Sequence, residues 1–593
     1  MDLQELSKLL KTQLAHLLVS IPESKDLVLD ADLTKPLDRV AGISFLKEHG
    51  VDKIFKLEAG QKALPGCGQR VYLVHPKMTT MKYIADHIKT ERGKGERRAY
   101  KIVFVPRRLH ICEKILESEG VMGYVTLDEF PLELFPLDTD LLSLETPDFF
   151  KSFYLENDTT YLHTVASSLV NLQRLFGKIP NVYTIGKGAK MTYELMQSMF
   201  EAHVDRKESK FHVGQLFIVD RDVDLISPMC SAMTYEALLD ETFGIECCMI
   251  NFDSSVTGDN KDTKLLLTSQ DEIYSQIRDR HFAHVFSYLS AKAKDLQAIY
   301  SKKNNLKTVG DMKEYVANEL RVLKHQQKLL ATHIGACEVI MKTKNKSDFE
   351  SFIRTEHSLL EGTDTKENLN YIEECLQKQF SPTLTLRLMC LLSLTQEGLS
   401  ARDYKNLTTQ FLHSHGFEHL VTFLSLKRLG LLTVQEVGGV GNRAGPSLGK
   451  KSNYRMLNRR LALVPKQGEE TDLKTPTDMS YIFSGAYTPI SCKLIEQILT
   501  RDTLVGLEEV GRLCGGLFSD IKQKKQPASG RSGAPTDPVM KVALVYFLGG
   551  CTYSEISALR FISRQLGVRI IVATTAIVSS QSLLGDIMEK SGR

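Results

Sequence analysis

The stretch Leu216-Phe-Ile-Val-Asp-Arg-Asp-Val-Asp-Leu-Ile-Ser-Pro228 passes without a break from apolar residues to charged ones. An uninterrupted apolar run is typical of a buried strand in a parallel sheet. Because ligands of α/β proteins bind beyond the carboxyl ends of such strands, Asp220, Arg221, Asp222 and Asp224 lie where an active site would lie. The same residues also fit a structural ion-pair network, in which carboxylates hold the guanidinium of Arg221.

Other short apolar runs indicate that this strand is part of a repeated pattern. Runs at 26–30, 71–75 and 101–106 alternate with helical stretches, and further runs follow at 182–185 and 215–219. Such alternation predicts parallel sheets covered by helices. Between the two groups, Phe135-Pro-Leu-Asp-Thr-Asp140 is expected to be a turn-rich junction. The sequence therefore predicts two successive α/β units.

The end of the chain adds one more strand–helix–strand unit. Lys541 to Gly550 and Val568 to Thr574 are expected to be strands, and Ser554 to Arg564 a helix. A unit of about fifty residues buries too little surface to be stable alone. We therefore expect it to complete the second sheet, which makes the second α/β domain discontinuous.

The intervening region, from about Leu265 to Leu429, shows helix-period patterns and few strand signals. A long helix is expected from Asp311 to Met341, because a mostly apolar series steps along it by four and three residues. Its members are Val316, Leu320, Leu323, Gln327, Leu330, Ile334, Cys337 and Met341. Two interpretations remain open: ordinary packing against a neighbouring helix, or a docking face for helices of another protein.

Motifs for catalysis are weak. The nearest match to a phosphate-binding loop, Ala444-Gly-Pro-Ser-Leu-Gly-Lys-Lys451, has Ala for the first Gly and Lys for the hydroxyl residue. The chain shows no nucleophile elbow and no Cys in a recognisable nucleophile context. We predict no catalytic, cofactor or metal residues, and the structural interpretation of Arg221 is favoured.

Composition limits the class of protein further. With 593 residues the chain is too long for one core, and its formal net charge of +3 gives no case for binding nucleic acid. Eleven cysteines without a CxxC pair indicate free thiols in the cytosol. The apolar runs Val542 to Gly550 and Ile570 to Val578 are about nine residues each, against the ~20 needed to span a bilayer. Any membrane role is therefore expected to be peripheral or through partners.

Three segments together resemble the Sec/Munc family of SNARE-binding proteins, and the resemblance covers essentially the whole chain. They are Ile218-Val-Asp-Arg-Asp-Val-Asp224, Thr234-Tyr-Glu-Ala-Leu-Leu-Asp240 and Phe547-Leu-Gly-Gly-Cys-Thr-Tyr-Ser-Glu-Ile-Ser-Ala-Leu-Arg-Phe561. Details such as Phe104-Val-Pro-Arg-Arg108 are more similar to the B-type than to the A-type branch of the vacuolar protein sorting 33 subgroup. One departure is a loop around 437–451 that is shorter than expected for the B-type branch.

The resemblance implies an arch of three domains: two Rossmann-like parallel-sheet domains, with a mostly helical domain inserted in the second. The expected boundaries are 1–133 for domain 1, 134–248 with 478–593 for domain 2, and 249–477 for domain 3, which divides into 249–361 and 362–477. It also implies a structural signature made of Asp220, Arg221, Asp224, Gly549, Gly550 and Glu555.

In function, the resemblance implies a non-enzymatic protein that holds SNARE helices between domains 1 and 3 and regulates vesicle docking and fusion. Syntaxin-type helices and assembled bundles are the expected SNARE partners, and Rab GTPases are further candidates. On the long helix, the candidate SNARE-binding residues are Arg321, Lys324, His325 and Lys328.

The resemblance further implies a constant partner similar to the vacuolar protein sorting 16B subunit, whose helical solenoid would grip domain 3. The candidate contact residues are Phe417, Phe423, Leu426, Leu429, Tyr454 and Leu457, although core packing explains such apolar positions equally well. The expected location is cytoplasmic, at the periphery of late endosome, lysosome or recycling endosome membranes. The alternative function is a nucleotide-dependent enzyme or switch on an α/β scaffold, favoured only by the carboxylate-rich strand end and the near-miss loop.

Overall fold

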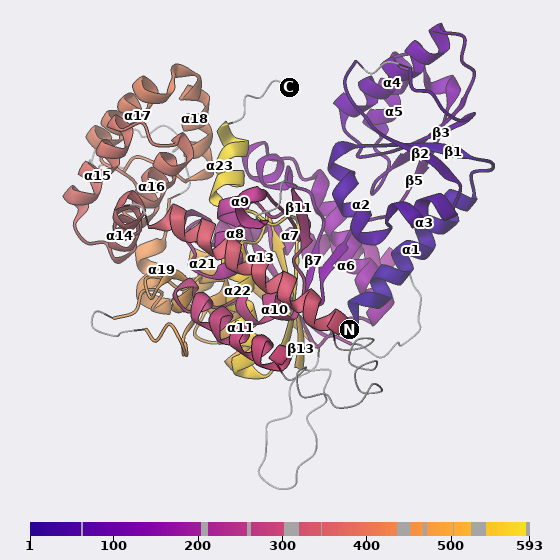
Figure 1. Ribbon diagram of the computed structural model, residues 1–593. Helices are drawn as coiled ribbons and strands as arrows, with labels where there is room; N and C mark the ends of the chain where they lie inside the picture. Colours follow the sequence, from indigo (N-terminus) through magenta and orange to yellow (C-terminus); the bar gives the residue numbers. More distant parts are fainter. Residues whose placement is uncertain are drawn as a thin grey trace, which may run out of the picture. The chain divides into compact units, whose positions relative to one another are not determined.

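The computed structural model describes residues 1–60, 63–202, 212–257, 262–301, 320–345, 347–435, 451–466, 471–501, 503–522 and 541–588 (Figure 1). Its internal contacts divide the chain into two compact units. The first consists of residues 1–145 with 163–175, and the second of residues 146–162 with 176–593.

The first unit contains a parallel sheet of five strands in the order β2-β1-β3-β4-β5. The strands are β1 (Lys25–Leu29), β2 (Val51–Lys56), β3 (Gln69–Val74), β4 (Ala99–Phe104) and β5 (Val125–Glu129). Apolar side chains of β1, β3 and β4 pack with those of α4 and α5 in a buried core, as expected from the runs at 26–30, 71–75 and 101–106. The predicted α/β character of this region is confirmed.

The first unit also contains helices, the first of which lies near the N-terminus of the chain. They are α1 (Leu3–Val19), α2 (Thr34–Val40), α3 (Ile43–Glu48), α4 (Met78–Gly93), α5 (His110–Ser118) and most of α6 (Thr160–Phe176).

The expected junction at 135–140 is instead an antiparallel hairpin of β6 (Phe135–Asp138) and β7 (Leu141–Ser143). The prediction missed these strands because Pro136 and the Asp-Thr-Asp segment signal a turn, and the turn takes up only Thr139 and Asp140.

The sheet of the second unit is assembled from distant parts of the sequence. It contains β12 (Leu517–Ile521), β8 (Asn181–Ile185), β9 (Gln215–Asp220), β13 (Val542–Leu548) and β14 (Arg569–Thr574) in this order. Strand β9 lies between β8 and β13, parallel to both, and β12 pairs antiparallel with β8. The prediction that the C-terminal strands complete an earlier sheet is therefore confirmed. In Figure 1 the yellow elements β13 and α22 lie among magenta elements from the middle of the chain.

Helices dominate the rest of the second unit, which also has a small hairpin of β10 (Met249–Phe252) and β11 (Thr263–Leu266). The helices are α7 (Lys187–Ala202), α8 (Tyr235–Phe243), α9 (Ser254–Thr257), α10 (Glu272–Ile277), α11 (Val285–Ser301), α13 (Leu320–Lys344), α14 (Ser347–Glu361), α15 (Thr365–Gln377), α16 (Pro382–Thr395), α17 (Ala401–His415), α18 (Leu420–Leu429), α19 (Tyr454–Leu461), α20 (Ile490–Arg501), α21 (Glu508–Leu513), α22 (Tyr553–Leu566) and α23 (Ser580–Met588). Among the described residues, no helix has both the length and the apolar character required to cross a bilayer.

The long helix α13 accounts for most of the helix predicted at 311–341; residues 311–319 lie outside the described part of the chain. Leu323, Leu330 and Cys337 of the predicted seam are buried, but Gln327 and Met341 are exposed. A straight helix has 3.6 residues per turn, so a seam drawn every 3.5 residues drifts away from the buried face. The inward face packs against α9 and α11, which supports ordinary helix packing for this side of α13.

Candidate functional site

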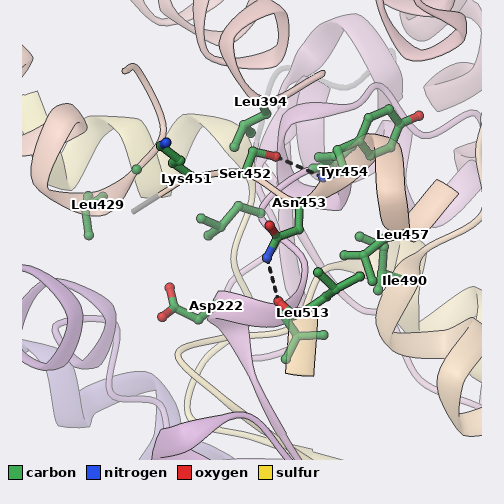
Figure 2. Close-up of a pocket in the computed structure, with 14 residues that line it drawn as sticks. Asp222, Leu394, Leu429, Lys451, Ser452, Asn453, Tyr454, Leu457, Ile490 and Leu513 are labelled. Atoms are coloured by element: carbon green, nitrogen blue, oxygen red, sulfur yellow. Dashed lines mark hydrogen bonds between the residues drawn. The ribbon is translucent and has the colours of Figure 1, made fainter. Parts of the chain in front are cut away.

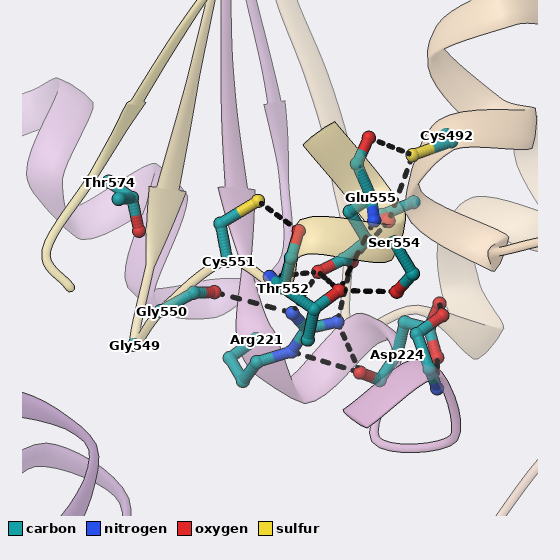
Figure 3. A network of polar contacts seen from close by, with 12 residues as sticks. Arg221, Asp224, Cys492, Gly549, Gly550, Cys551, Thr552, Ser554, Glu555 and Thr574 are labelled. Carbon is teal, nitrogen blue, oxygen red and sulfur yellow. Dashed lines mark hydrogen bonds and ion pairs between the residues drawn. The ribbon is translucent and has the colours of Figure 1, made fainter. Parts of the chain in front are cut away.

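Arg221 lies at the centre of a buried network at the carboxyl end of β9 (Figure 3). Its side chain is 1% exposed and makes a two-pronged ion pair with Glu555, with Nη1–Oε2 and Nη2–Oε1 distances of 2.6 and 2.8 Å. Its Nε donates to the backbone oxygen of Asp224 at 2.9 Å, and Nη1 donates to that of Gly550 at 3.3 Å. One guanidinium therefore connects the loop after β9 to the loop after β13, more than 300 residues later in the sequence.

Asp224 fixes the next turn of the same loop. Its Oδ1 accepts hydrogen bonds from the backbone N–H groups of Ile226 and Ser227, at 3.0 and 2.9 Å. Its Oδ2 accepts from the hydroxyl of Ser227 at 2.6 Å and from the backbone N–H of Ile490 at 2.9 Å, and the hydroxyl of Tyr487 also donates to this carboxylate. A carboxylate with this many donors has no lone pair directed at an open space.

Glu555 also stabilises the first turn of α22. The hydroxyl of Thr552 accepts from the backbone N–H of Glu555 at 3.2 Å, and the Glu555 carboxylate accepts from the backbone N–H of Thr552 at 3.0 Å, which forms a capping box. Ser491 donates to the same carboxylate at 2.7 Å. Although burial alone would raise the pKa of Glu555, the charge and hydrogen bonds of Arg221 hold it below its usual value.

Two glycines let the backbone pass close to this network. Gly549 and Gly550 have φ angles of +84° and +105°, which favour glycine. A Cβ on Gly549 would lie 2.5 Å from the ring of Tyr154, and one on Gly550 would lie 2.5 Å from Val578. This explains why the two residues are glycines in the Phe547 to Phe561 segment.

Asp220, the last residue of β9, anchors a different segment. It accepts hydrogen bonds from the hydroxyl of Tyr154 and, at 2.7 Å, from the backbone N–H of Gly188 at the start of α7. The predicted signature residues Asp220, Arg221, Asp224, Gly549, Gly550 and Glu555 are thus all engaged in hydrogen bonds within the protein. Their arrangement supports the structural interpretation of the opening stretch over an active site.

A small cavity lies beside the same loop, between Asp222 and the start of α19 (Figure 2). Its volume is about 50 Å³, and Leu394, Leu429 and Leu457 are among its apolar lining residues. Small-molecule pockets usually measure about 300 to 1,000 Å³, so this cavity cannot hold a nucleotide. Of the near-miss phosphate loop, only Lys451 is described; it lines the cavity, and residues 444–450 lie outside the described part of the chain.

Two groups of side chains in the first unit have potential metal-binding atoms within 4.8 Å of one another. In the first group Asp26 already accepts from the backbone N–H of Cys67 at 2.7 Å and pairs with Arg70 at 3.3 Å. In the second, Asp32 pairs with Lys77 at 3.0 Å. Because a metal ion would compete with these basic side chains, we assign neither group a metal. The groups are Asp26, Asp52 and Cys67, and Asp30, Asp32 and His75.

The predicted SNARE-binding residues lie on α13. Lys324, His325 and Lys328 are exposed, whereas Leu323, Leu330 and Cys337 of the same helix are buried. The side chain of Arg321 lies outside the described part of the structure. A spacing of four residues places Lys324 and Lys328 next to each other, so they form a basic stripe along the helix surface.

The predicted partner-binding residues are placed differently. Phe423, Leu426, Leu429, Tyr454 and Leu457 are all buried, so these five side chains pack within the protein and are not available to a partner. Leu429 and Leu457 line the small cavity, and Tyr454 donates to the backbone oxygen of Leu360 at 2.8 Å. The assignment to a docking surface is therefore corrected to core packing for these five residues. Phe417 alone among the six is exposed.

The opposite face of the same segment carries an apolar surface that the sequence analysis did not identify. Its members are Phe417, Leu420, Val421 and Leu424, which are between 45% and 64% exposed. Their spacing of three, one and three residues places them on one side of α18 and of the turn before it. We call these four residues the α18 stripe. The sequence pattern contained it, but both faces of α18 are apolar, and only burial distinguishes them.

Known proteins match this chain over nearly its whole length. Residues 25–586 match the model of the Sec1 family. Vacuolar protein sorting-associated protein 33B of Danio rerio is 44% identical over 609 residues, which cover 99% of this chain and 98% of the relative. Vacuolar protein sorting-associated protein 33A of Rattus norvegicus is 34% identical over 99% of this chain and 98% of its own length.

Solved structures agree in fold. The Unc18 protein in the crystal structure of the Unc18–syntaxin 1 complex from Monosiga brevicollis superposes with a TM-score of 0.61 at 19% identity, covering 99% of each chain. The family match covers residues 25–586, and the relative from Danio rerio and the Unc18 structure align over nearly the full length of this chain and of their own. This chain therefore belongs to the Sec1 family, the Sec/Munc family that its three signature segments indicated.

Proposed function

We propose that the protein is a non-enzymatic, SNARE-binding regulator of vesicle docking and fusion in endosomal and lysosomal trafficking. The observation that carries the proposal is the Sec1 family match over residues 25–586. The Arg221–Glu555 network supports its non-enzymatic character, because the carboxylates at the sheet edge, where a catalytic site would lie, are engaged in holding loops together.

The exposed side of α13 is proposed to contact SNARE helices. Lys324, His325 and Lys328 offer positive charge along a helix whose other side is fixed to the protein by packing. Isolated SNARE segments lose conformational entropy when they become helical, and a rigid surface that holds them in register lowers this cost. The fold shared with an Unc18 protein solved in complex with syntaxin 1 supports this proposal.

The helical region is proposed to be a third domain, residues 249–477, inserted into the second α/β domain. Its outer surface would bind a helical solenoid protein similar to vacuolar protein sorting 16B. The buried candidates cannot serve in this contact, so we propose the α18 stripe in their place. Four apolar side chains at helical spacing form a surface into which helices of a solenoid can pack.

Recruitment to membranes is proposed to occur through such partners, with Rab GTPases as further candidates. The vacuolar sorting names of the relatives favour late endosomes, lysosomes or recycling endosomes as the site of action. The protein would then act from the cytoplasm at the periphery of these membranes.

A binding experiment with charge-reversed variants tests the α13 surface. Lys324→Glu with Lys328→Glu should weaken binding to syntaxin-type helices by about tenfold or more, because like charges across an interface are repulsive. Lys366→Glu with Lys405→Glu makes the same change in charge at exposed positions on α15 and α17 and should leave binding unchanged. Equal binding by both folded variants would overturn the α13 assignment. Absence of SNARE binding by the wild-type protein with its partner would overturn the proposed function itself.

A further inference from the structure

The first unit contains a cavity lined by α1, α6 and the segment that follows β5. Its volume is about 600 Å³. Small-molecule sites usually measure about 300 to 1,000 Å³, so this cavity can hold an organic ligand. Every residue that lines it belongs to the first unit, and its leucines are Leu6, Leu9, Leu10, Leu134, Leu172 and Leu175.

The leucines make much of the wall apolar. Leu6 and Leu10 of α1 and Leu172 of α6 are buried, so packing holds them in place. Leu9 is 39% exposed, which indicates that the cavity opens to solvent beside it. Water next to such walls finds few hydrogen-bond partners, so its displacement by an apolar group is favourable.

Glu133 is the only acidic residue among the described residues that line the cavity. The side-chain N–H of Asn171 donates to its Oε2 at 2.9 Å, and the hydroxyl of Ser167 also donates to the carboxyl group. Both donors are neutral, and both line the cavity as well. Because a carboxylate can accept about four hydrogen bonds, these two donors leave room for a ligand to donate to Glu133.

The protein compensates the charge of Glu133 only in part. Burial raises its pKa, the two hydrogen bonds and the charge of Arg107 offset this only in part, and the resulting pKa is about 7. Glu555 differs, because its ion pair with Arg221 holds its pKa below the usual value. A cation placed beside Glu133 would favour the ionised carboxylate in the way that Arg221 favours that of Glu555.

Other charged groups leave the carboxylate available to such a cation. Helix α1 contributes leucines and Gln13 to the lining, and the segment after β5 contributes Glu133. Arg174 of α6 lines the cavity, but its side chain is exposed, where water and salt screen its charge. Its Nη1 donates to Oδ1 of Asn171 at 3.5 Å. A cation at Glu133 therefore meets a partly buried negative charge, whereas the positive charge of Arg174 is screened.

We propose that this cavity binds a small organic molecule that carries an ammonium group on an apolar body. The ammonium group pairs with the carboxylate of Glu133, and the apolar body lies against the leucines of α1 and α6. A neutral molecule of the same shape contacts the same leucines but forms no ion pair. A lysine side chain of a partner protein offers the same ammonium group, so the test includes it as a separate source.

The test uses the full chain with phenylbutylamine, and phenylbutanol serves as a neutral probe of nearly the same shape. In ligand-observed NMR titrations at pH 8, the amine should bind about tenfold or more tightly than the alcohol, because only the amine forms a charge-assisted hydrogen bond. Glu133→Gln should reduce the affinity for the amine to that for the alcohol. Glu117→Gln makes the same change at an exposed position of α5 and should leave both affinities unchanged.

The pH dependence of the wild-type chain tests Glu133 without a substitution. With a pKa of about 7, the ionised fraction of Glu133 rises from about a tenth at pH 6 to about nine tenths at pH 8. Because an alkylamine with a pKa of about 10 stays protonated over this range, its affinity should rise about five- to tenfold. The affinity for the alcohol should not rise.

Two further measurements locate the probe and its source. Leu9→Trp narrows the opening of the cavity and should weaken binding of the amine and the alcohol alike. A short peptide with one lysine among leucines should bind more weakly than the amine. Equal binding of amine and alcohol, the same affinity for the amine at both pH values, or wild-type affinity of a folded Glu133→Gln variant would overturn the proposal. So would unchanged binding by Leu9→Trp, or tighter binding of the peptide, which would assign the cavity to a partner protein.

Discussion

Two groups of charged residues in this chain look alike in sequence and differ in the structure. Arg221, with its neighbouring carboxylates, is 1% exposed and makes a two-pronged ion pair with Glu555. Lys324 and Lys328 on α13 are exposed. The first group connects distant loops, whereas the second leaves its charges available to another molecule. Position at the end of a buried strand, rather than the presence of charge, therefore separates residues that stabilise the fold from residues suited to binding.

Removal of Arg221 should produce the largest effect. Arg221→Ala leaves the Glu555 carboxylate buried without its cation, and breaking a buried pair in this way costs about 3 to 5 kcal/mol. Thermal and urea unfolding should both show the loss, and partner binding should fall with it. If partner binding were lost while the stability stayed the same, Arg221 would have a direct role in function, and the comparison would fail.

A double variant separates loss of the pair from loss of packing. Arg221→Met with Glu555→Leu removes both charges and fills similar volume, so it should be less destabilising than Arg221→Ala. Lys324→Ala serves as the exposed control, and it should change the free energy of unfolding by less than about 0.5 kcal/mol. A double variant as unstable as Arg221→Ala would show that hydrogen bonds to the backbone, rather than the unpaired charge, dominate.

Helix α18 offers the same contrast within one element. Leu426 is fully buried, and Leu426→Ala should lower the stability by about 2 to 5 kcal/mol through loss of packing. Leu424, two residues earlier, belongs to the α18 stripe and is 45% exposed. Leu424→Ala should lower the stability by less than about 1 kcal/mol and should instead weaken binding of the solenoid partner. Equal destabilisation by the two variants would remove the distinction between core and stripe.

The fold could be predicted from the sequence wherever a pattern had only one structural explanation. The apolar runs at 71–75, 215–219 and 541–550 indicated strands, and their parallel pairing followed from the helices between them. The antiparallel strands β6 and β7 were missed, because turn residues lie inside so short a hairpin. Strand β12 was missed as well, since Leu517-Phe-Ser-Asp-Ile521 shows no regular alternation.

The candidate sites were harder to predict for a physical reason. Helix α18 is apolar on two sides, so spacing alone cannot show that Leu426 faces the core while Leu424 faces solvent. The contacts of Arg221 were predictable in kind, as an ion pair, but its partner Glu555 lies in the first turn of α22, 334 residues later in the sequence. The resemblance to a known family supplied Glu555 as a signature residue, and the structure supplied the contact.

Glu133 in the first unit differs from Glu555, because burial rather than an ion pair is the main influence on its pKa. Burial raises its pKa, hydrogen bonds from Ser167 and Asn171 and the charge of Arg107 offset this only in part, and the resulting pKa is about 7. A raised pKa means that the folded protein binds this proton more tightly than the unfolded chain does. The contribution of Glu133 to stability is thus complete below the ordinary glutamate pKa and is lost as the pH rises through about 7.

Glu133→Gln mimics the protonated form and should remove this loss. The variant should be about 1 to 2 kcal/mol more stable than the wild type at pH 8 and should show a flatter pH dependence between pH 5 and 7. Unfolding by urea at several pH values measures both. A variant less stable than the wild type at pH 8 would mean that the charged form is well accommodated, as it is at Glu555.

The smallest effect on stability is expected at the exposed residues Lys324 and Lys328 of α13. Lys324→Ala with Lys328→Ala removes two charges that are open to solvent, so the free energy of unfolding should change by less than about 0.5 kcal/mol. Binding to SNARE helices should nevertheless weaken, and its dependence on salt should become shallower, because fewer charges across the interface remain to be screened. Titrations at two salt concentrations measure this slope. An unchanged slope would mean that SNARE helices do not meet these lysines, and α13 would then join Arg221 among the structural parts of the protein.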